Sequence, residues 1–299
     1  MSNERPWNIA VLGPGGVGGL LAALLSRAGH RVVCLAGEET AEALRGGGIT
    51  VSSKQFGDFT AGVSADTELR TPVDAVIIAV KATAMPGALD RLPASALGDA
   101  LVLPLLNGID HMALLRERYA PEQVVAGTIR VESTRTAPGV VVQGSPFANL
   151  ELASDTAPAE RVEALAAVLR SAGLGATSEA GEAEILWSKM AFLAPMALTT
   201  TRHDAPVGVV RFAHRDDLLD ALAETAAVAA ADGVTVDTER ARAMYDAFAP
   251  ETKSSMLRDA EAGLPLELDA IGGAVLRAAA RGGVAVPVTA RLVAEIEGS

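Results

Sequence analysis

A glycine-rich turn near the start of the chain is the feature that most restricts its fold. Residues 13–18 read GPGGVG and fit the pattern G-x-G-x-x-G. They follow residues 7–12, an apolar segment typical of a buried strand, and lead into residues 17–28, an apolar segment typical of a helix that ends at Gly29. In this context the glycines permit a tight turn, close approach of a pyrophosphate and close helix–strand packing. The sequence therefore predicts a dinucleotide-binding strand–turn–helix unit.

The positive end of the predicted helix would hold the phosphates through its first N–H groups. The residues expected to bind the cofactor at this turn are Gly13, Gly15, Gly16, Val17 and Gly18. An acidic residue about 20 positions after the motif binds the ribose 2′-hydroxyl of NAD, and Glu38 occupies that position. Two alternatives stay open: a glycine turn without a nucleotide, and a Glu38 that only occupies the first turn of a helix.

The pattern continues as alternating strands and helices. Strands are predicted at residues 31–35, 74–80 and 101–105, and helices at residues 85–92 and 112–119. Such alternation indicates βαβ units and a parallel sheet. The first half of the chain therefore predicts an α/β domain.

The secondary structure that the sequence predicts changes twice after residue 119. Residues 123–152 are rich in β-formers broken by Pro and Gly, which predicts antiparallel strands that extend the sheet, followed by a helix over residues 160–172 and a short strand near Ala176. Beyond Gly181 only helical patterns remain, over residues 182–200, 218–232, 239–248 and 270–281. We therefore expect a Rossmann-type dinucleotide-binding domain, residues 1–181, and an all-helical substrate and catalytic domain, residues 182–299.

Length and composition agree with two domains and exclude several classes of partner. The chain has 299 residues, with 37 acidic against 25 basic side chains and a net charge of −12. This acidic balance opposes binding to nucleic acids or to a membrane surface, and the apolar runs are shorter than the ~20 residues of a membrane helix. The single cysteine, Cys34, and four scattered histidines predict neither a disulfide nor a metal site. No export signal is recognised, so we expect a cytoplasmic protein.

Seven short motifs occur in a recognisable order: GPGGVG at residues 13–18, VKA at 80–82, LNG at 106–108, LWSKM at 186–190, SSMLRD at 254–259, ELD at 267–269 and GVAVP at 283–287. Together they resemble the ketopantoate reductase (2-dehydropantoate 2-reductase) family over essentially the whole chain. This resemblance implies a Rossmann-type domain, a helical domain, and NADPH-dependent reduction of a 2-oxo acid, a reaction of pantothenate biosynthesis.

The resemblance also implies roles for individual residues. By position, Lys189 resembles the general acid that protonates the carbonyl oxygen, and Glu267 the carboxylate that holds the substrate hydroxyl. Lys81 and Asn107 resemble residues beside the nicotinamide, with Asn107 also near the substrate, and Ser255 a ligand of the substrate carboxylate. The chemistry agrees, because reduction of a carbonyl leaves an alkoxide that an ammonium group can stabilise and protonate.

Each of these residues also has an ordinary structural interpretation. Lys189 would then be a surface lysine, and Asn107-Gly108 only a turn. Glu267 and Asp269 would cap the helix that begins at residue 270, and Ser255 would cap a short helix that begins at residue 256.

The sequence departs from the family at two places. Two substrate-binding positions lie on the same face of the predicted helix as Lys189. They hold Leu193 and Ala197, where the family commonly has asparagines. Pro195 lies between them and should kink or break the helix. These changes favour a more apolar substrate. Gly37 replaces an arginine that binds the 2′-phosphate of NADP, so the resemblance implies NADP(H) whereas Gly37 and Glu38 favour NAD(H).

The sequence is compatible with three functions. The first is a nicotinamide-dependent reductase of a small 2-oxo acid, which we adopt. The second is a related dehydrogenase or imine reductase that acts on a different, more apolar substrate. The third is a non-catalytic dinucleotide sensor, which would need neither Lys189 nor Glu267. The sequence indicates no nucleic-acid or membrane partner and leaves a homodimer open.

Overall fold

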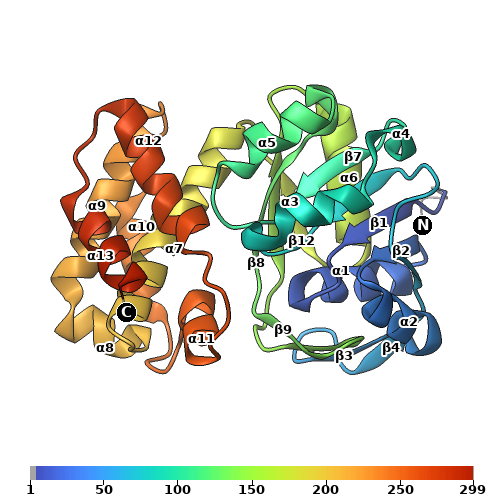
Figure 1. Cartoon of the computed structure of the whole chain (residues 1–299), viewed down its shortest axis with the longest axis horizontal. Coiled ribbons are helices and arrows are strands. Elements are labelled where there is room, and N and C mark those ends of the chain that lie inside the picture. The colour runs from blue at the N-terminus through green and yellow to red at the C-terminus, as the bar shows by residue number, and fades with distance from the viewer. Residues whose placement is uncertain (1–4, 299) are drawn as a thin grey trace. The chain divides into compact units, whose positions relative to one another are not determined.

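The computed structural model describes residues 5–298, which form two compact units. The first unit comprises residues 5–106 and His111–Glu182, and the second comprises Asn107–Asp110 and residues 183–298. In Figure 1 the first unit runs from blue to yellow-green and the second from yellow to red. The short loop Asn107–Asp110 therefore belongs to the second unit although the chain on both sides of it belongs to the first.

A parallel sheet of five strands forms the centre of the first unit, which confirms the predicted Rossmann-type fold. The chain passes from β1 to β2 on one side and returns to β6 on the other, so β1 lies where the strand order reverses. Residues 9–12 of β1 are at most 1% exposed, as expected for a strand covered on both faces. In spatial order the strands are β5 (Ser64–Asp66), β2 (Arg31–Leu35), β1 (Asn8–Leu12), β6 (Ala75–Ile78) and β7 (Leu101–Pro104).

The β-rich segment does not extend this sheet, so that prediction was wrong. Its strands belong to two further sheets, one of which includes two strands that the sequence did not predict. The reason is a parallel pairing that places Gln143 of β10 opposite Ser53 of β3, and the local pattern carries no information on such a distant partner. The sheets contain, in spatial order, β4 (Phe59–Ala61), β3 (Ile49–Ser53), β10 (Val140–Gln143) and β9 (Ser133–Ala137), and β12 (Gly175–Ser178), β11 (Asn149–Ala153) and β8 (Ala126–Arg130).

The helices of the first unit cover these sheets. The predicted helix over residues 85–92 is divided into the helix α3 (Met85–Ala88) and a 3₁₀ turn Leu89–Arg91, and a further 3₁₀ turn, Ala82–Ala84, precedes it. Gly87 disfavours a regular helix at this point. The other helices are α1 (Gly16–Arg27), α2 (Glu38–Gly47), α4 (Ala94–Leu97), α5 (His111–Arg118) and α6 (Ala159–Ser171).

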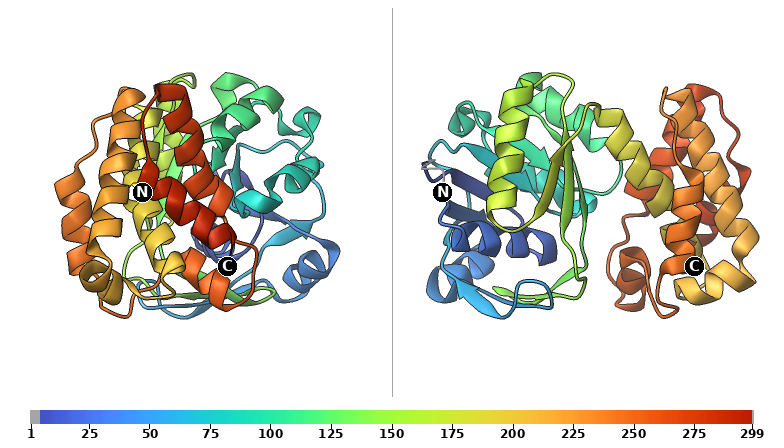
Figure 2. Two further views of the ribbon diagram at one scale, coloured as in Figure 1. Left: turned by 60° about the vertical axis from the view of Figure 1, so that its left-hand side comes forward. Right: turned by 180° about the vertical axis from the view of Figure 1, so that it is seen from behind.

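The second unit is all-helical, as predicted (Figure 2). Its core includes Trp187, Met190 and Leu198 from the first helix, packed with Val275 and Leu292 from the last two. The helices are α7 (Glu182–Arg202), α8 (Val207–Ala213), α9 (Arg215–Ala231), α10 (Thr238–Ala247), α11 (Ser255–Glu261), α12 (Ala274–Gly282) and α13 (Pro287–Glu297), with a π-helical turn Asp269–Gly273 before α12.

Pro195 does not break α7, so of the predicted kink or break the break was wrong. Proline has no N–H, so the carbonyl of Ala191 loses its helical donor. The buried hydroxyl of Tyr245 lies 3.4 Å from that carbonyl and donates to the neighbouring carbonyl of Phe192 at 2.7 Å. The Tyr245 hydroxyl of α10 thus provides a hydrogen-bond donor near the carbonyl group that has lost its backbone N–H partner. This contact allows α7 to continue past the proline.

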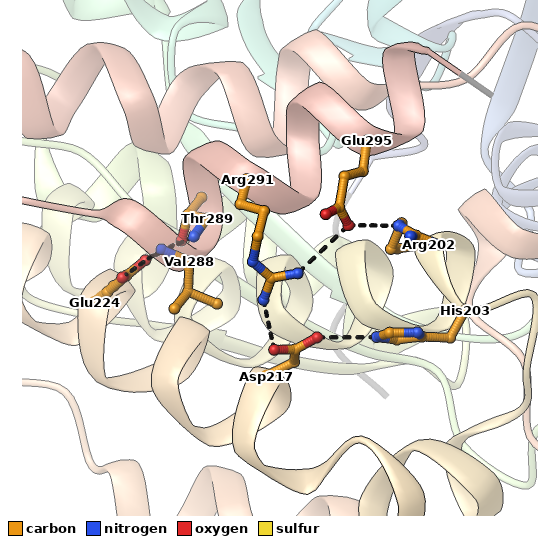
Figure 3. Close-up of polar contacts among 8 residues, drawn as sticks. All are labelled: Arg202, His203, Asp217, Glu224, Val288, Thr289, Arg291 and Glu295. Atoms are coloured by element: carbon orange, nitrogen blue, oxygen red, sulfur yellow. Dashed lines mark hydrogen bonds and ion pairs between the residues drawn. The ribbon is translucent and has the colours of Figure 1, made fainter.

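Polar contacts fix the position of α13 against α7 and α9 (Figure 3). The Glu224 carboxylate accepts hydrogen bonds from the backbone N–H groups of Val288 and Thr289, both at 2.8 Å. It thereby caps the start of α13 from a neighbouring helix. One turn further on, Arg291 binds Asp217 at 2.6 Å.

Asp217 is the centre of this group of charges. It also contacts His203 Nε2 at 3.0 Å, just after the end of α7. Burial alone would raise the pKa of Asp217, but hydrogen bonds from His203 and Arg291 and the charge of Arg291 outweigh it and leave that pKa below its ordinary value. The stability that Asp217 contributes is therefore present above the unfolded-state pKa of about 3.9 and is lost as pH falls below it.

We predict that Asp217→Asn lowers the free energy of unfolding at pH 7 by about 1 kcal/mol, because Arg291 and His203 lose their anionic partner. The difference from wild type should shrink as pH falls toward 3, since the wild-type carboxylate is then being protonated. Thermal unfolding at both pH values measures this, with Asp220→Asn on the exposed side of α9 as the control. A difference that is equal at both pH values would contradict the prediction.

Candidate functional site

The glycines of the turn between β1 and α1 have different physical roles. Gly13 has a φ of +83°, and a Cβ there would lie 2.4 Å from Cγ1 of Val80. A Cβ at Gly18 would lie 2.2 Å from the carbonyl oxygen of Gly13. At Gly15, however, the nearest atom to a Cβ is the Gly13 oxygen at 4.0 Å. Gly13 and Gly18 are therefore required by packing, whereas Gly15 borders open space that a ligand can occupy.

The start of α1 is suited to bind phosphate. Gly15 is the N-cap residue and provides no side chain, and the first turn contains no acidic residue. The first N–H groups of a helix have no acceptor within the helix and lie at the positive end of its dipole. Together with the space beside Gly15, this arrangement fits the pyrophosphate of a dinucleotide.

Ser133, which the sequence analysis missed, holds this turn from the other side. Its hydroxyl donates to the carbonyl oxygen of Gly16 at 2.8 Å, and a Cβ at Gly16 would lie 2.2 Å from the Ser133 carbonyl oxygen. Gly16 is thus a glycine because the edge strand β9 passes close to it. The one signal in the sequence was the extra glycine itself, since G-x-G-x-x-G does not require one at that position.

Two predicted cofactor residues lie after the carboxyl ends of parallel strands, the edge at which open α/β sheets bind ligands. Lys81 follows β6 and is the exposed N-cap of a 3₁₀ turn. Glu38 is the exposed first residue of α2 after β2, and its carboxylate binds Arg45 Nη1 at 3.0 Å. Gly37 before it is the N-cap, and a Cβ there would meet no atom within 4 Å.

Asn107 and Glu267 meet in the second unit, although 160 positions separate them. The Asn107 amide donates to Glu267 Oε2 at 3.0 Å, and Glu267 is only 8% exposed. Gly108 has a φ of +89°, and a Cβ there would lie 2.3 Å from the Ala270 carbonyl oxygen. Asn107-Gly108 is therefore more than a turn, because it packs directly against the segment that carries the buried carboxylate.

The capping alternatives for Ser255 and Asp269 were wrong. The N-cap of α11 is Ser254, whose hydroxyl accepts from the backbone N–H of Leu257 at 3.1 Å, and Ser255 is the exposed first residue of the helix. The turn that begins at Asp269 has no side-chain cap, and the Asp269 carboxylate instead binds Arg277 at 2.6 Å.

Lys189, Leu193 and Ala197 lie at successive turns of α7. Lys189 and Leu193 are partly exposed, and Leu193 packs against the core that also contains Leu268 and Ile271. The segments that carry Lys189 and Glu267 therefore share one core. Ala197 is 0% exposed within it, so its methyl group packs inside the unit.

Residues 5–298 contain neither a cluster of metal-binding side chains nor a membrane-spanning helix. No three His, Cys, Asp or Glu side chains are grouped so that they could hold a metal ion. No helix in this part of the chain has the length and apolarity to cross a membrane.

Comparisons with known proteins point to one family over most of the chain. Residues 9–153 match the family model described as ketopantoate reductase PanE/ApbA, and residues 183–298 match its C-terminal model. The 2-dehydropantoate 2-reductase of Halobacterium salinarum is 29% identical over 293 residues, 94% of each chain. The solved 2-dehydropantoate 2-reductase of Geobacter metallireducens is 28% identical with a TM-score of 0.89, covering 97% of this chain and 99% of the other.

A further solved structure shares the fold. It is a ternary complex of D-mandelate dehydrogenase with NADH and anilino(oxo)acetate, 23% identical with a TM-score of 0.88, and 97% of each chain is covered.

Gly15 and Gly18 should respond differently to replacement by alanine. Gly15→Ala should change the free energy of unfolding by less than about 1 kcal/mol but weaken binding of the reduced nicotinamide cofactor about tenfold or more, because the new methyl enters the space left for phosphate. Gly18→Ala should destabilise the protein by about 1–3 kcal/mol, because its methyl meets a backbone carbonyl. Thermal unfolding and fluorescence titration measure the two effects. Equal losses of stability in both variants would contradict the assignment.

Proposed function

The chain belongs to the ketopantoate reductase family and is an NAD(P)H-dependent oxidoreductase, and we propose that it reduces a small 2-oxo acid with Lys189 as proton donor. The proposal rests on the hydrogen bond between the Asn107 amide and the buried carboxylate of Glu267. A buried carboxylate is costly unless polar partners satisfy it, so its presence next to a docked loop supports a ligand-binding role.

Lys189 has the chemistry that this reaction requires. The bound reduced nicotinamide supplies the hydride. The carbonyl oxygen gains negative charge during the reduction, and the ammonium group of Lys189 both stabilises that charge and delivers the proton. The position of Lys189 in the LWSKM segment, on a helix that shares its core with the Glu267 segment, supports this role.

Glu267 and Asn107 orient the substrate. A carboxylate can accept several hydrogen bonds, so Glu267 can receive one from a substrate hydroxyl in addition to that from Asn107. The Asn107 amide fixes the carboxylate oxygen to which it is bonded, and such fixation lowers the entropy cost of orienting the substrate. Ser255, exposed at the start of α11, is the proposed ligand of the substrate carboxylate.

The preferred substrate is more apolar than ketopantoate. Leu193 presents a partly exposed apolar side chain one turn after Lys189, where the family commonly has asparagine. A substrate hydroxyl placed against it loses water without gaining a partner, at a cost of roughly 1–3 kcal/mol. A D-mandelate dehydrogenase of the same fold forms a ternary complex with NADH and anilino(oxo)acetate, an oxoacetate that carries a phenyl group, which supports the proposal.

The test is a panel of 2-oxo acids assayed with NADH and NADPH on the wild type and on Lys189→Ala. We expect turnover by the wild type, and a kcat at least about 10²-fold lower in Lys189→Ala with cofactor affinity unchanged. Lys54→Ala, which removes an exposed lysine from the first unit, is the control. A wild-type kcat in Lys189→Ala would end the assignment.

The same panel tests the substrate proposal through kcat/KM for ketopantoate and for its deoxy, aliphatic analogue. Leu193→Asn should shift the preference toward ketopantoate. Ala197 is left unchanged, because a polar side chain at this buried position would destabilise the core. A wild type that already prefers ketopantoate tenfold or more would contradict the apolar preference.

We also propose that NADH is preferred over NADPH. The Glu38 carboxylate would accept hydrogen bonds from the ribose hydroxyls and repel a 2′-phosphate, and Gly37 offers no side chain to bind that phosphate. Arg45 supports this arrangement, because its contact with Glu38 at 3.0 Å holds the carboxylate at the start of α2.

Fluorescence titration of both reduced cofactors tests this preference. Wild type should bind NADPH no more tightly than NADH, and Glu38→Ala should improve NADPH binding relative to NADH, because a repulsive charge is removed and Arg45 is released. Glu39→Ala, which removes the same charge from the next exposed position, is the matched control. A wild-type preference for NADPH above about 100-fold, or about 2.7 kcal/mol, would overturn the proposal.

A further inference from the structure

Arg277 on α12 joins two separate segments of the second unit. Its Nε and Nη2 atoms donate to Asp110 Oδ2 at 2.9 and 2.7 Å. Its Nη1 atom donates to Asp269 Oδ1 at 2.6 Å, and Nη2 also donates to the Asp269 backbone carbonyl at 3.0 Å. One planar guanidinium thus binds two carboxylates and a carbonyl in fixed directions, which a lysine ammonium could not reproduce.

The two segments joined by Arg277 are the ones that carry the Asn107–Glu267 hydrogen bond. Asp110 lies three residues after Asn107 in the loop Asn107–Asp110, and Asp269 lies two residues after Glu267. The hydrogen bond at one end and the ion pairs at the other therefore close a ring of contacts. Within such a ring, a change at the ion pairs alters the distance and angle at the hydrogen bond.

The contribution of these ion pairs to global stability should be small. The side chains of Arg277 and Asp110 are 44% and 41% exposed, and that of Asp269 is 84% exposed. Exposed ion pairs add little to the free energy of unfolding, because solvent and salt screen them. An arginine with two carboxylate partners at such a place is better explained by geometry than by stability.

We propose that Arg277 is a positioning residue that sets the Asn107–Glu267 hydrogen bond by holding the loop Asn107–Asp110 against the Glu267 segment. The proposal rests on the function proposed above, because that hydrogen bond matters for activity only if Glu267 binds the substrate. Arg277 itself contacts neither substrate nor cofactor in this scheme. Its loss should therefore weaken substrate binding while the cofactor affinity and the fold persist.

The test compares Arg277→Met and Arg277→Lys with Arg281→Met, which removes an exposed arginine one turn further along the same helix. Hydrogen exchange of the full-length protein reports on the backbone amides of residues 107–110 and 267–271. Steady-state kinetics give KM and kcat for the 2-oxo acid, and titration gives the cofactor Kd. Arg277→Met should speed exchange in both segments and raise KM about tenfold, with the cofactor Kd within about twofold of wild type. Arg277→Lys should be intermediate.

The outcomes separate this proposal from the proposed function. Unchanged exchange in Arg277→Met overturns it, and so does faster exchange with a wild-type KM. An equal loss in Arg281→Met also overturns it, because the effect would then reflect the charge of α12. A wild type that reduces no 2-oxo acid overturns the proposed function, and the role of Arg277 at a substrate site with it. Unchanged exchange beside normal wild-type turnover overturns the role of Arg277 alone.

Discussion

The close contact of the glycine turn with the strands around it constrains the first unit most strongly. Gly13 packs against the residues just after β6, Gly18 packs against the carbonyl group of Gly13 within the turn, and Gly16 packs against the edge strand β9. Each contact is too close for any side chain, so the start of α1 is held on three sides. The open side, at Gly15, is the one at which helix geometry exposes N–H groups. The same packing that stabilises the fold therefore leaves a place for phosphate.

The second unit depends on a different kind of constraint, in which a short loop inserts a residue into a distant site. Leu105 and Leu106 follow β7 in the chain, and the next four residues already belong to the second unit. This connection brings the Asn107 amide to Glu267. Close packing of Gly108 on Ala270 leaves the loop little freedom to move away. A buried carboxylate thus receives a hydrogen bond from a part of the chain that is otherwise remote.

Helix α7 shows how a tertiary contact overrides a local rule. Pro195 removes a backbone donor, which by itself favours a break in the helix. The hydroxyl of Tyr245, supplied by α10, contacts the carbonyls that proline affects. The uninterrupted helix keeps Lys189 and Leu193 on one rigid element with the core residue Ala197. The polar neighbour, which lies about 50 residues away in sequence, is not detectable in the local pattern.

Features that depend on neighbouring residues could be predicted from the sequence alone. The glycine turn, the alternation of strands and helices, and the change to an all-helical unit are local patterns, and motif positions identified Asn107, Lys189 and Glu267 as candidates. Contacts between distant groups could not be predicted and became visible in the three-dimensional structure. It paired β10 with β3, brought Ser133 to Gly16, and joined Asp110 to Asp269 through Arg277. The physical reason is that periodicity and capping act over a few residues, whereas hydrogen bonds and ion pairs between remote segments form only after packing has placed them together.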